Sequence, residues 1–417
     1  MNDTFRYILA GGLIFLIIIL QPVYLEWLGY DTGAVSEKNL EIVDSESVVA
    51  ATREKNITPS FESGSAAILT KQGPAESFIT IVTPLYTATL TNKSGGSFTN
   101  YFLSSENSDE LKHLGGYNDG GFFNPNIPVS LIINSEEDCM PCLAEYNDMD
   151  DMYTFINQPF TLLNYSNRQD TIFLDSGTIE LKYSLNNNDG LALINKIVSF
   201  SANKYINEHY YEINDEAFEY SNNLELLWYG GLRPSEEKED EDIAYGSGII
   251  SQAGETEDIQ AKDSEKNIAR EVFKGRTDWV AIRTKYFMSA IIAKDPGKYA
   301  TLSEHNESFG NRKHTPLYSA SIGYPLNVST ISSSIYLGPL DVDYLSQTDV
   351  SLDASMNWGF APIRPISKGV LWVLKFMHNK LNLNYGLVLL LFAVLVRLIT
   401  GPLTKKSYES SQNMQKI

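Results

Sequence analysis

The residue best placed to do chemistry in this 417-residue chain is an arginine within an apolar segment. Arg397 follows ten consecutive apolar residues, 387–396, and Pro402 and two lysines come soon after it. An arginine inside a bilayer costs on the order of 3 kcal/mol, so such residues normally face a bundle interior or a water-filled cavity. This cost favours a functional role. The alternative is snorkelling, because an arginine near a helix end can extend its side chain to the interface.

The only two cysteines, Cys139 and Cys142, form a C-x-x-C pair. Such a pair occurs in redox dithiols and as half of a zinc site. No second pair completes a zinc ligand set, and no βαβ pattern surrounds this one. In an oxidising compartment we expect either a disulfide that closes a local loop or two cysteines whose proximity has no particular role.

Other groups offer little chemistry. The acidic run 236–242 is predicted to be a solvated loop, because a calcium site needs a spaced Asp/Asn-Gly pattern that this run lacks. The chain has no P-loop and no G-x-S-x-G element. We therefore expect no enzyme activity, catalytic residue, cofactor or metal ligand. Five histidines show neither ligand-like nor acid–base spacing, and they are His113, His209, His305, His314 and His378.

The charge balance points away from nucleic acid. The formal net charge is −20, and no basic face that could neutralise phosphates is evident. The acidity suits a solvated domain outside the cytoplasm, because positive charge concentrates on the cytoplasmic side of membrane proteins. The length allows two or three domains.

Two apolar blocks predict membrane spans. Residues 1–30 contain Arg6 and then an apolar run; bulky residues rather than a small-residue cleavage site follow, so we expect an uncleaved transmembrane anchor. Residues 384–404 form the second predicted span. Lys405 and Lys406 follow it, so the positive-inside rule places both chain ends in the cytoplasm. Residues 31–77 are poor in aromatics and are predicted to be a flexible tether.

Residues 78–350 are predicted to form a large antiparallel β-sandwich, so the fold class is mixed. The clearest signal is a hairpin in which residues 179–185 alternate, residues 187–190 turn and residues 191–200 return. Many short strands with turn signals favour a sandwich. Further predicted strands are 85–90, 209–213, 224–229, 279–292 and 331–337.

A moderately amphipathic helix is predicted for residues 360–380, directly before the second span. Apolar residues recur there at helical spacing, which indicates a helix lying in the plane of the membrane interface. The alternative is a helix packed at the base of the β-domain.

Several segments together resemble one family, the YidC-type membrane protein insertases of bacterial inner membranes. Each is weakly specific alone, but their order and spacing over nearly the whole chain make the combination specific. The matching segments are YGGLRP (229–234), DWVAIRTKYF (278–287), YLGPLDVDYL (336–345), NWGFAPIRPIS (357–367) and the stretch 396–417.

The resemblance implies a signal anchor, a periplasmic domain like a β-supersandwich, an interfacial helix and a core of five transmembrane helices. That core forms a hydrophilic groove open to the cytoplasm and to lipid. The family's groove arginine falls on Arg397. Residues 405–417 correspond to the start of a cytoplasmic hairpin, so the chain is expected to be the N-terminal portion of an insertase. The implied partners are nascent membrane proteins, the lipid bilayer, a Sec-type translocon and the ribosome.

Two other classes compete with the insertase. β-Supersandwich domains resemble sugar mutarotases, but the histidines lack the spacing for that chemistry, and binding of a glycan or a partner protein remains open. The second class is a two-span membrane-anchored periplasmic scaffold, which would have little reason to place an arginine in its second span.

Overall fold

The computed structural model describes residues 73–415 with gaps, and it describes side chains as far as Gly401. The gaps are 104–112, 119, 134–138, 148–151, 166–169, 218–222, 262–267, 326, 357, 360–361 and 382. The predicted anchor (1–30) and most of the predicted tether (31–77) lie outside the described residues. The chain divides into two compact units, 55–357 and a second made of 1–54 and 358–417.

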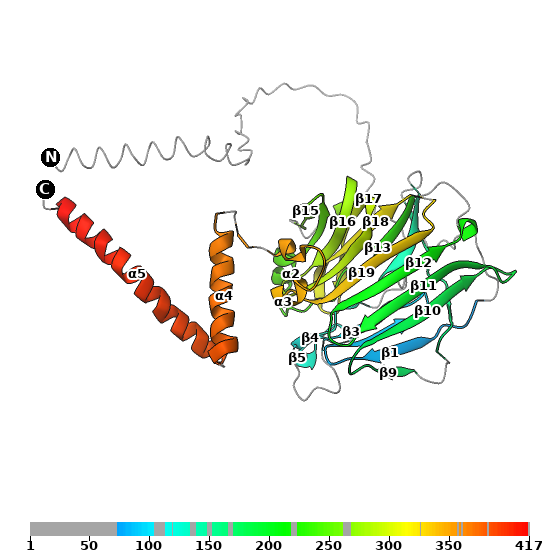
Figure 1. Cartoon of the computed structure of the whole chain (residues 1–417), viewed down its shortest axis with the longest axis horizontal. Helices are drawn as coiled ribbons and strands as arrows, with labels where there is room; N and C mark the ends of the chain where they lie inside the picture. Colours follow the sequence, from blue (N-terminus) through cyan, green and yellow to red (C-terminus); the bar gives the residue numbers. More distant parts are fainter. Residues whose placement is uncertain are drawn as a thin grey trace, which may run out of the picture. The chain divides into compact units, whose positions relative to one another are not determined.

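The first unit (55–357), which we call the β-unit, is built mainly of β-strands (Figure 1). Its large sheet follows the order β7-β6-β13-β18-β17-β19-β12-β11-β10-β8, with β14, β15 and β16 attached beside β17. The strands are β6 (Cys142–Asn147), β7 (Met152–Phe155), β8 (Thr161–Leu162), β10 (Thr178–Asn186), β11 (Ala192–Ser201), β12 (Ile206–Ile213), β13 (Asn223–Trp228), β14 (Ser247–Gln252), β15 (Glu255–Ile259), β16 (Ile268–Arg283), β17 (Phe287–Phe309), β18 (Arg312–Tyr324) and β19 (Thr330–Pro339).

Smaller elements complete this unit. A four-stranded sheet has the order β3-β2-β1-β9, and β4 and β5 form a two-stranded sheet. The additional elements are β1 (Phe78–Val82), β2 (Thr87–Thr91), β3 (Ser97–Phe102), β4 (Leu114–Tyr117), β5 (Phe123–Pro128), β9 (Thr171–Phe173), η1 (Asp215–Ala217), α2 (Glu239–Tyr245), α3 (Val342–Leu345) and η2 (Leu352–Ser355).

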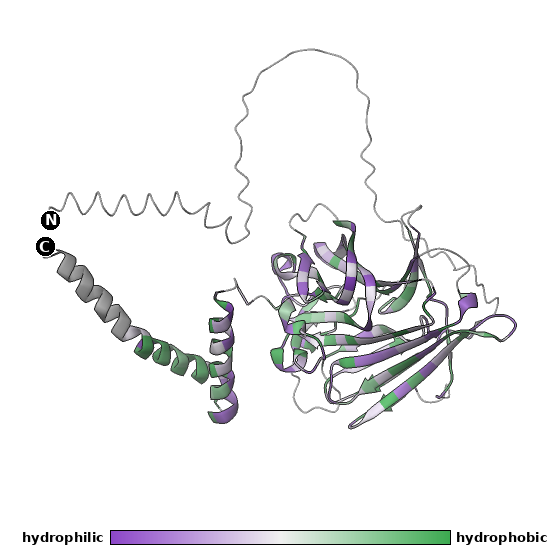
Figure 2. Cartoon of the chain, turned by 45° about the horizontal axis from the view of Figure 1, so that its top comes forward, coloured by the Kyte–Doolittle hydropathy of each residue, from purple (hydrophilic) through white to green (hydrophobic). Residues whose placement is uncertain are grey.

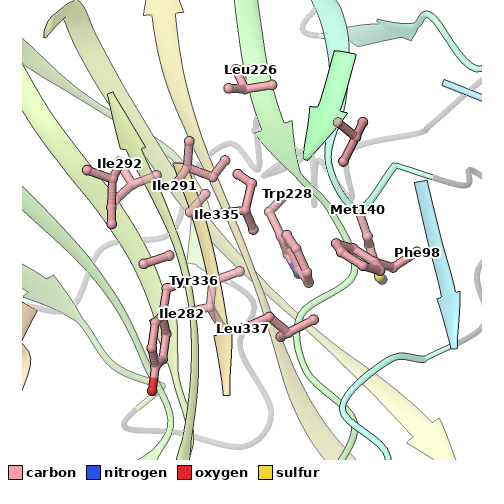
Figure 3. Close-up of a cluster of buried hydrophobic side chains, with 14 of the residues drawn as sticks. Phe98, Met140, Leu226, Trp228, Ile282, Ile291, Ile292, Ile335, Tyr336 and Leu337 are labelled. Carbon is pink, nitrogen blue, oxygen red and sulfur yellow. The ribbon is translucent and has the colours of Figure 1, made fainter. Parts of the chain in front are cut away.

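The hydrophobic core joins the small and large sheets. Trp228 of β13 is buried, and its ring centroid lies 6.3 Å from that of Phe98 on β3. The indole Nε1 donates to the carbonyl of Gly231 at 2.9 Å, so its polar atom is satisfied within the core. Figure 3 shows Trp228 pointing toward Phe98 and Met140, with Ile335 and Leu337 from the middle of the large sheet nearby.

The structure confirms most of the predicted strands. The predicted hairpin is β10–β11, paired antiparallel from Thr178–Ser201 to Asn186–Ala192, and Gly190 in its turn has φ 84°. The prediction of one continuous strand at 279–292 is wrong, because these residues belong to two strands, β16 and β17, joined by a turn. Thr284 closes that turn by exchanging hydrogen bonds with Phe287. The sandwich is also not wholly antiparallel, since β1 and β9 pair in parallel.

Two glycines allow the β4–β5 hairpin to contact the β17–β18 turn. Gly121 and Gly310 both have positive φ angles, 73° and 60°. A Cβ atom added to Gly310 would lie 1.9 Å from the carbonyl oxygen of Gly121, which is far inside van der Waals contact. The two backbones can therefore approach this closely only because neither residue has a side chain.

Lys196 is an unusual member of the core. It lies on β11 and is completely buried, and its Nζ donates to the carbonyl of Ser94 at 3.0 Å and sits 4.9 Å from the Tyr211 ring centroid. Burial lowers the pKa of Lys196 to about 7. His209 is buried on the adjacent strand, and desolvation, followed by the charge of Lys196, lowers the pKa of this imidazole.

The exit of the chain from the β-unit is fixed by an arginine. Arg283, at the end of β16, donates from Nη1 to the carbonyl of Ser355 at 2.6 Å. The Ser355 hydroxyl contacts the Met288 sulfur at 3.3 Å. The last turn of the unit, η2, is thus attached to the β16–β17 hairpin.

The second unit contains two long helices, α4 (Arg364–Leu381) and α5 (Tyr385–Gln415). Asn384 caps α5, because its Oδ1 accepts from the Leu387 amide at 2.9 Å. The backbone continues as one helix across the predicted boundary at 404/405. Within the part of the chain that the structure describes, no helix has both the length and the apolar character needed to cross a membrane.

We expect Lys196→Met to stabilise the β-unit near neutral pH. Because the pKa of Lys196 falls from 10.5 unfolded to about 7 folded, the unfolded chain binds the extra proton between these values. Wild-type stability should therefore fall as pH decreases from 10.5 to 7, by on the order of a few kcal/mol. Urea unfolding at several pH values, followed by tryptophan fluorescence, should show a flatter profile for Lys196→Met. An unchanged profile would contradict the prediction. The exposed Lys204→Met is the control.

We expect Gly310→Ala to destabilise the β-unit, because its methyl group would collide with the Gly121 backbone. The matched control is Gly254→Ala, where φ is 87° but nothing lies within 4 Å of the added Cβ. Both variants carry the strain of a positive φ, about 1 kcal/mol, so the difference in their urea midpoints measures the collision. Equal midpoints would show that the hairpin moves aside freely.

Candidate functional site

Arg397, the one residue predicted to act in a functional site, lies on α5. The described side chains of α5, residues 385–401, are mostly apolar and exposed; Leu390 is 66% exposed and Leu398 is 68% exposed. Arg397 is also exposed, and it belongs to none of the ion pairs found among the described residues. In Figure 2 this stretch of α5 is coloured as hydrophobic, whereas α4 alternates between hydrophobic and hydrophilic residues. An exposed guanidinium on an apolar helix needs water or polar partners from elsewhere.

The helix face around Arg397 carries small residues. Ala393 lies four positions before the arginine and Thr400 and Gly401 lie three and four positions after it, so all share its side of the helix. The Thr400 hydroxyl donates a hydrogen bond to the Val396 carbonyl oxygen at 2.8 Å. Small side chains therefore lie next to the guanidinium, but the larger Val394, three positions before it, and Leu390, seven before it, share this side of α5.

Helix α4 is amphipathic in the manner the sequence predicted. Arg364, Lys368 and Lys375 lie within about 40° of arc around the helix axis. Ile366, exposed by 64%, belongs to the opposite, apolar side. Trp372 is 66% exposed at the boundary between the two sides. The interfacial position of this helix stays a prediction.

The junction between α4 and α5 is held by side-chain contacts. The His378 ring stacks on the Tyr385 ring, with centroids 4.1 Å apart. Its Nδ1 also lies 2.7 Å from the Leu383 carbonyl oxygen. His378 therefore joins the last turn of α4 to the first turn of α5, and no ligand-binding role is needed to explain it.

The four histidines of the β-unit do not meet. His113 packs edge-on against Phe287, at a centroid distance of 6.0 Å, and His305 lies 3.2 Å from a carboxylate oxygen of Glu307. His209 is buried on β12, and His314 contributes its backbone amide to Glu239. Among the described residues, no group of three or more His, Cys, Asp or Glu side chains could hold a metal ion.

Cys139 and Cys142, whose state the sequence left open, form a disulfide. Both residues are fully buried in a small apolar cluster with Leu227, Phe155 and Tyr229. The disulfide thus lies inside packed side chains rather than in a surface cleft.

A buried carboxylate on β13 collects several hydrogen bonds. Glu225 is fully buried; its Oε1 accepts from Arg270 at 2.5 Å and from Tyr299 at 2.9 Å. Its Oε2 accepts from Tyr153 at 2.8 Å and from Ser321 at 2.5 Å. Burial and then the Glu225 charge raise the pKa of both tyrosines. Because both oxygens are occupied, this cluster is best understood as a clamp between strands.

The prediction that the acidic run 236–242 is a solvated loop is wrong in part. Residues 239–245 form α2, and Asp242 is buried with its Oδ2 2.6 Å from Arg312 Nη1. Lys285 pairs with Glu236 and Glu241. Burial raises the pKa of Asp242 to about 6, while Arg312 opposes that rise. These cations hold part of the run against the β-unit.

Comparison with known proteins identifies the family. The YidC periplasmic domain family matches residues 142–373, which is more than half of the chain. The chain belongs to the YidC family. A membrane protein insertase YidC of Chlorobium limicola is 24% identical over 410 residues, which cover 96% of this chain and 65% of that protein. That of Prosthecochloris aestuarii is 30% identical over 228 residues, which cover 52% and 38% of the two chains.

The chain therefore spans 38 to 65% of the length of these two YidC relatives. Among solved structures, a putative aldose 1-epimerase from Escherichia coli aligns over 63% of this chain and 99% of its own, with 8% identity and a TM-score of 0.29. A likeness this weak assigns no function.

We expect Arg312→Leu to destabilise the β-unit by about 3 kcal/mol, because it leaves the Asp242 carboxylate buried without its cation. The double variant Arg312→Leu/Asp242→Leu should recover much of that loss. Lys182→Leu is the control, since its pair with Glu180 is exposed and should contribute less than about 1 kcal/mol. Equal urea midpoints for Arg312→Leu and Lys182→Leu would contradict the prediction.

Proposed function

We propose that this chain provides the anchor, the periplasmic domain and the first core helix of a membrane protein insertase in a bacterial inner membrane. Membership of the YidC family and the placement of Arg397 on an exposed apolar helix carry the proposal. In this arrangement residues 1–30 and 384–404 cross the membrane, α4 lies in the outer interface, and both chain ends are cytoplasmic.

The proposed mechanism is physical rather than catalytic. A polar segment that crosses lipid loses its hydrogen-bonding partners, at several kcal/mol for each unsatisfied group. A hydrophilic groove that extends part-way into the bilayer provides water and polar partners and shortens the apolar path. Arg397 holds water in this groove and attracts acidic groups of the incoming segment. The apolar part of that segment then moves sideways into lipid, and no covalent bond changes.

The local structure around Arg397 supports this role. Ala393 and Thr400 leave room for water or a client segment on one flank of the guanidinium, and Gly401 adds space on the flank where Val394 also lies. The Thr400 hydroxyl is already used by the Val396 carbonyl, so the guanidinium is the main polar group of this face. A planar guanidinium also binds a carboxylate with two hydrogen bonds, which a lysine ammonium cannot do.

The proposed partners are nascent membrane proteins and the lipid bilayer, with a Sec-type translocon and the ribosome as further candidates. The alternative function is a two-span scaffold whose β-unit binds a glycan or a protein. The arginine on α5 favours the insertase, because a helix that only anchors a domain has no use for a charge placed within the bilayer.

We expect Arg397→Ala to reduce insertion of a small single-span client with an acidic translocated segment. The expected loss is about tenfold, as produced by removing about 1.4 kcal/mol of favourable interaction. Insertion should be measured in cells depleted of their own insertase and supplied with the variant. Arg397→Lys should retain part of the activity if charge is sufficient, and less if the guanidinium fork is needed.

Two controls make this test specific. Leu398→Ala changes the adjacent exposed residue on another side of α5 and should leave insertion near the wild-type level. A client with a neutral translocated segment should be less sensitive to Arg397→Ala than the acidic client. Normal insertion of the acidic client by Arg397→Ala would refute the groove role and favour the scaffold.

A further inference from the structure

The chain separates its charges sharply along its sequence. Residues 55–357 contain 43 acidic and 21 basic residues, a net charge of −22. By contrast, residues 354–408 contain no aspartate or glutamate and seven lysines and arginines. Four of those seven lie on α4. A segment of 55 residues without a single acidic group is unusual in a chain this acidic.

Three of the four basic residues of α4 lie on one side, and Lys380, in the last turn, lies on the other. Arg364, Lys368 and Lys375 form a line within about 40° of arc, which we call the basic strip. Ile366, Val370 and several further aliphatic residues lie opposite. A helix with a cationic strip and an opposite apolar side matches the pattern of helices that lie on membranes.

Aromatic side chains flank the basic strip. Trp372 and Phe376 stack with ring centroids 5.6 Å apart, and they are 66% and 47% exposed. On the N-terminal side the chain folds back, because the Ser367 hydroxyl donates to the Trp358 carbonyl at 3.3 Å. The Nζ of Lys368 lies 5.2 Å from the Trp358 ring centroid. A tryptophan exposed beside basic residues, as Trp372 is, is typical of the headgroup level of a bilayer.

We propose that the basic strip of α4 is a binding surface for anionic phospholipid headgroups. This rests on the proposed function, which places α4 in the membrane interface. Lysine or arginine near an anionic membrane surface contributes about 1 kcal/mol each. The β-unit, at −22, is repelled by such a surface, and the basic strip supplies the attraction that holds the adjoining chain against it.

The apolar side of α4 selects lipid over a soluble acidic protein. An acidic protein would pair with the basic strip but would leave Ile366, Trp372 and Phe376 exposed to water. A bilayer accepts both sides of the helix at once, with the acyl region against the aliphatic residues and phosphates against the cations. Trp372 lies near the boundary between the basic strip and the apolar side of α4, so its fluorescence can report which lipids contact the helix.

The test uses the full chain in lipid nanodiscs and measures quenching of Trp372 fluorescence by brominated lipids. The fluorescence signal of the Trp372→Phe variant is subtracted from that of the wild type, so that only the contribution of Trp372 remains. Brominated phosphatidylglycerol is compared with brominated phosphatidylcholine at equal mole fraction in otherwise matched mixtures. We expect phosphatidylglycerol to be enriched at Trp372 at least fivefold, the factor that one basic residue contributes. The enrichment should fall steeply between low and high salt.

Matched triple variants locate the effect. Replacing Arg364, Lys368 and Lys375 by glutamine should remove the enrichment. Replacing three exposed lysines of the β-unit by glutamine changes the net charge equally and should leave the enrichment intact. Those control positions are Lys182, Lys204 and Lys313. Circular dichroism checks that both triple variants keep their helix content, and the salt dependence tests the wild type without any substitution.

The outcomes separate this inference from the proposed function. Equal quenching of Trp372 by both lipids would overturn the anionic preference and leave the interfacial position of α4 standing. No quenching by either lipid would overturn both, because α4 would then not lie in the interface. Loss of enrichment in the control triple variant as well would assign the effect to total charge and refute the basic strip. Quenching that is abolished by a soluble acidic protein would favour a protein partner.

Discussion

The apolar contact between the two sheets of the β-unit is the interaction on which the rest of that unit depends. Trp228 and Phe98 come from strands 130 positions apart in sequence, and neither sheet can bury its inner face alone. The contact fixes β13 in the large sheet, and β13 also carries Glu225 on its other face. The hydrogen bonds to Glu225 then tie β7, β16, β17 and β18 together. Apolar packing on one face of β13 thereby positions a polar clamp on the other.

The chain uses charge in opposite ways in its two units. In the β-unit, cations neutralise acidic residues at short range, as Arg312 does for Asp242 and Arg270 for Glu225. In the second unit, residues 358–408 contain seven lysines and arginines and no aspartate or glutamate. Internal pairing serves the fold, whereas the cations of the helical segment are the groups that the proposed function assigns to water, lipid or a client.

Local signals in the sequence predicted the features that depend on neighbouring residues. The β10–β11 hairpin was predictable because its alternation and its Asn-Asp-Gly turn lie within a short window. The β16–β17 turn was missed because its residues include no glycine, proline, asparagine or aspartate, and Thr284 closes it by side-chain hydrogen bonds. The burial of Asp242 was missed because its cation, Arg312, lies 70 residues away.

Some further features of the structure also carry a signal in the sequence. Lys196 belongs to the same set of every-second positions as Ile194, Val198 and Phe200. Its place on the buried face of β11 could therefore be predicted from the sequence. The role of Arg397 was predicted from its insertion cost and from the family resemblance, and it stays a prediction. The small residues that share its face of α5 become apparent only once the helical register is known.

The attachment of Ser355 to Arg283 has a mechanical consequence. The chain leaves the β-unit through β19 and η2, and β19 lies between β17 and β12 in the interior of the large sheet. Tension applied beyond Met356 would reach the hydrogen bond between Arg283 and Ser355 first. If that bond gave way, the load would pass to a strand held by antiparallel ladders on both sides. Such a strand must shear past two neighbours, whereas an edge strand could be peeled away one hydrogen bond at a time, so the unit is tethered through one of its strongest points.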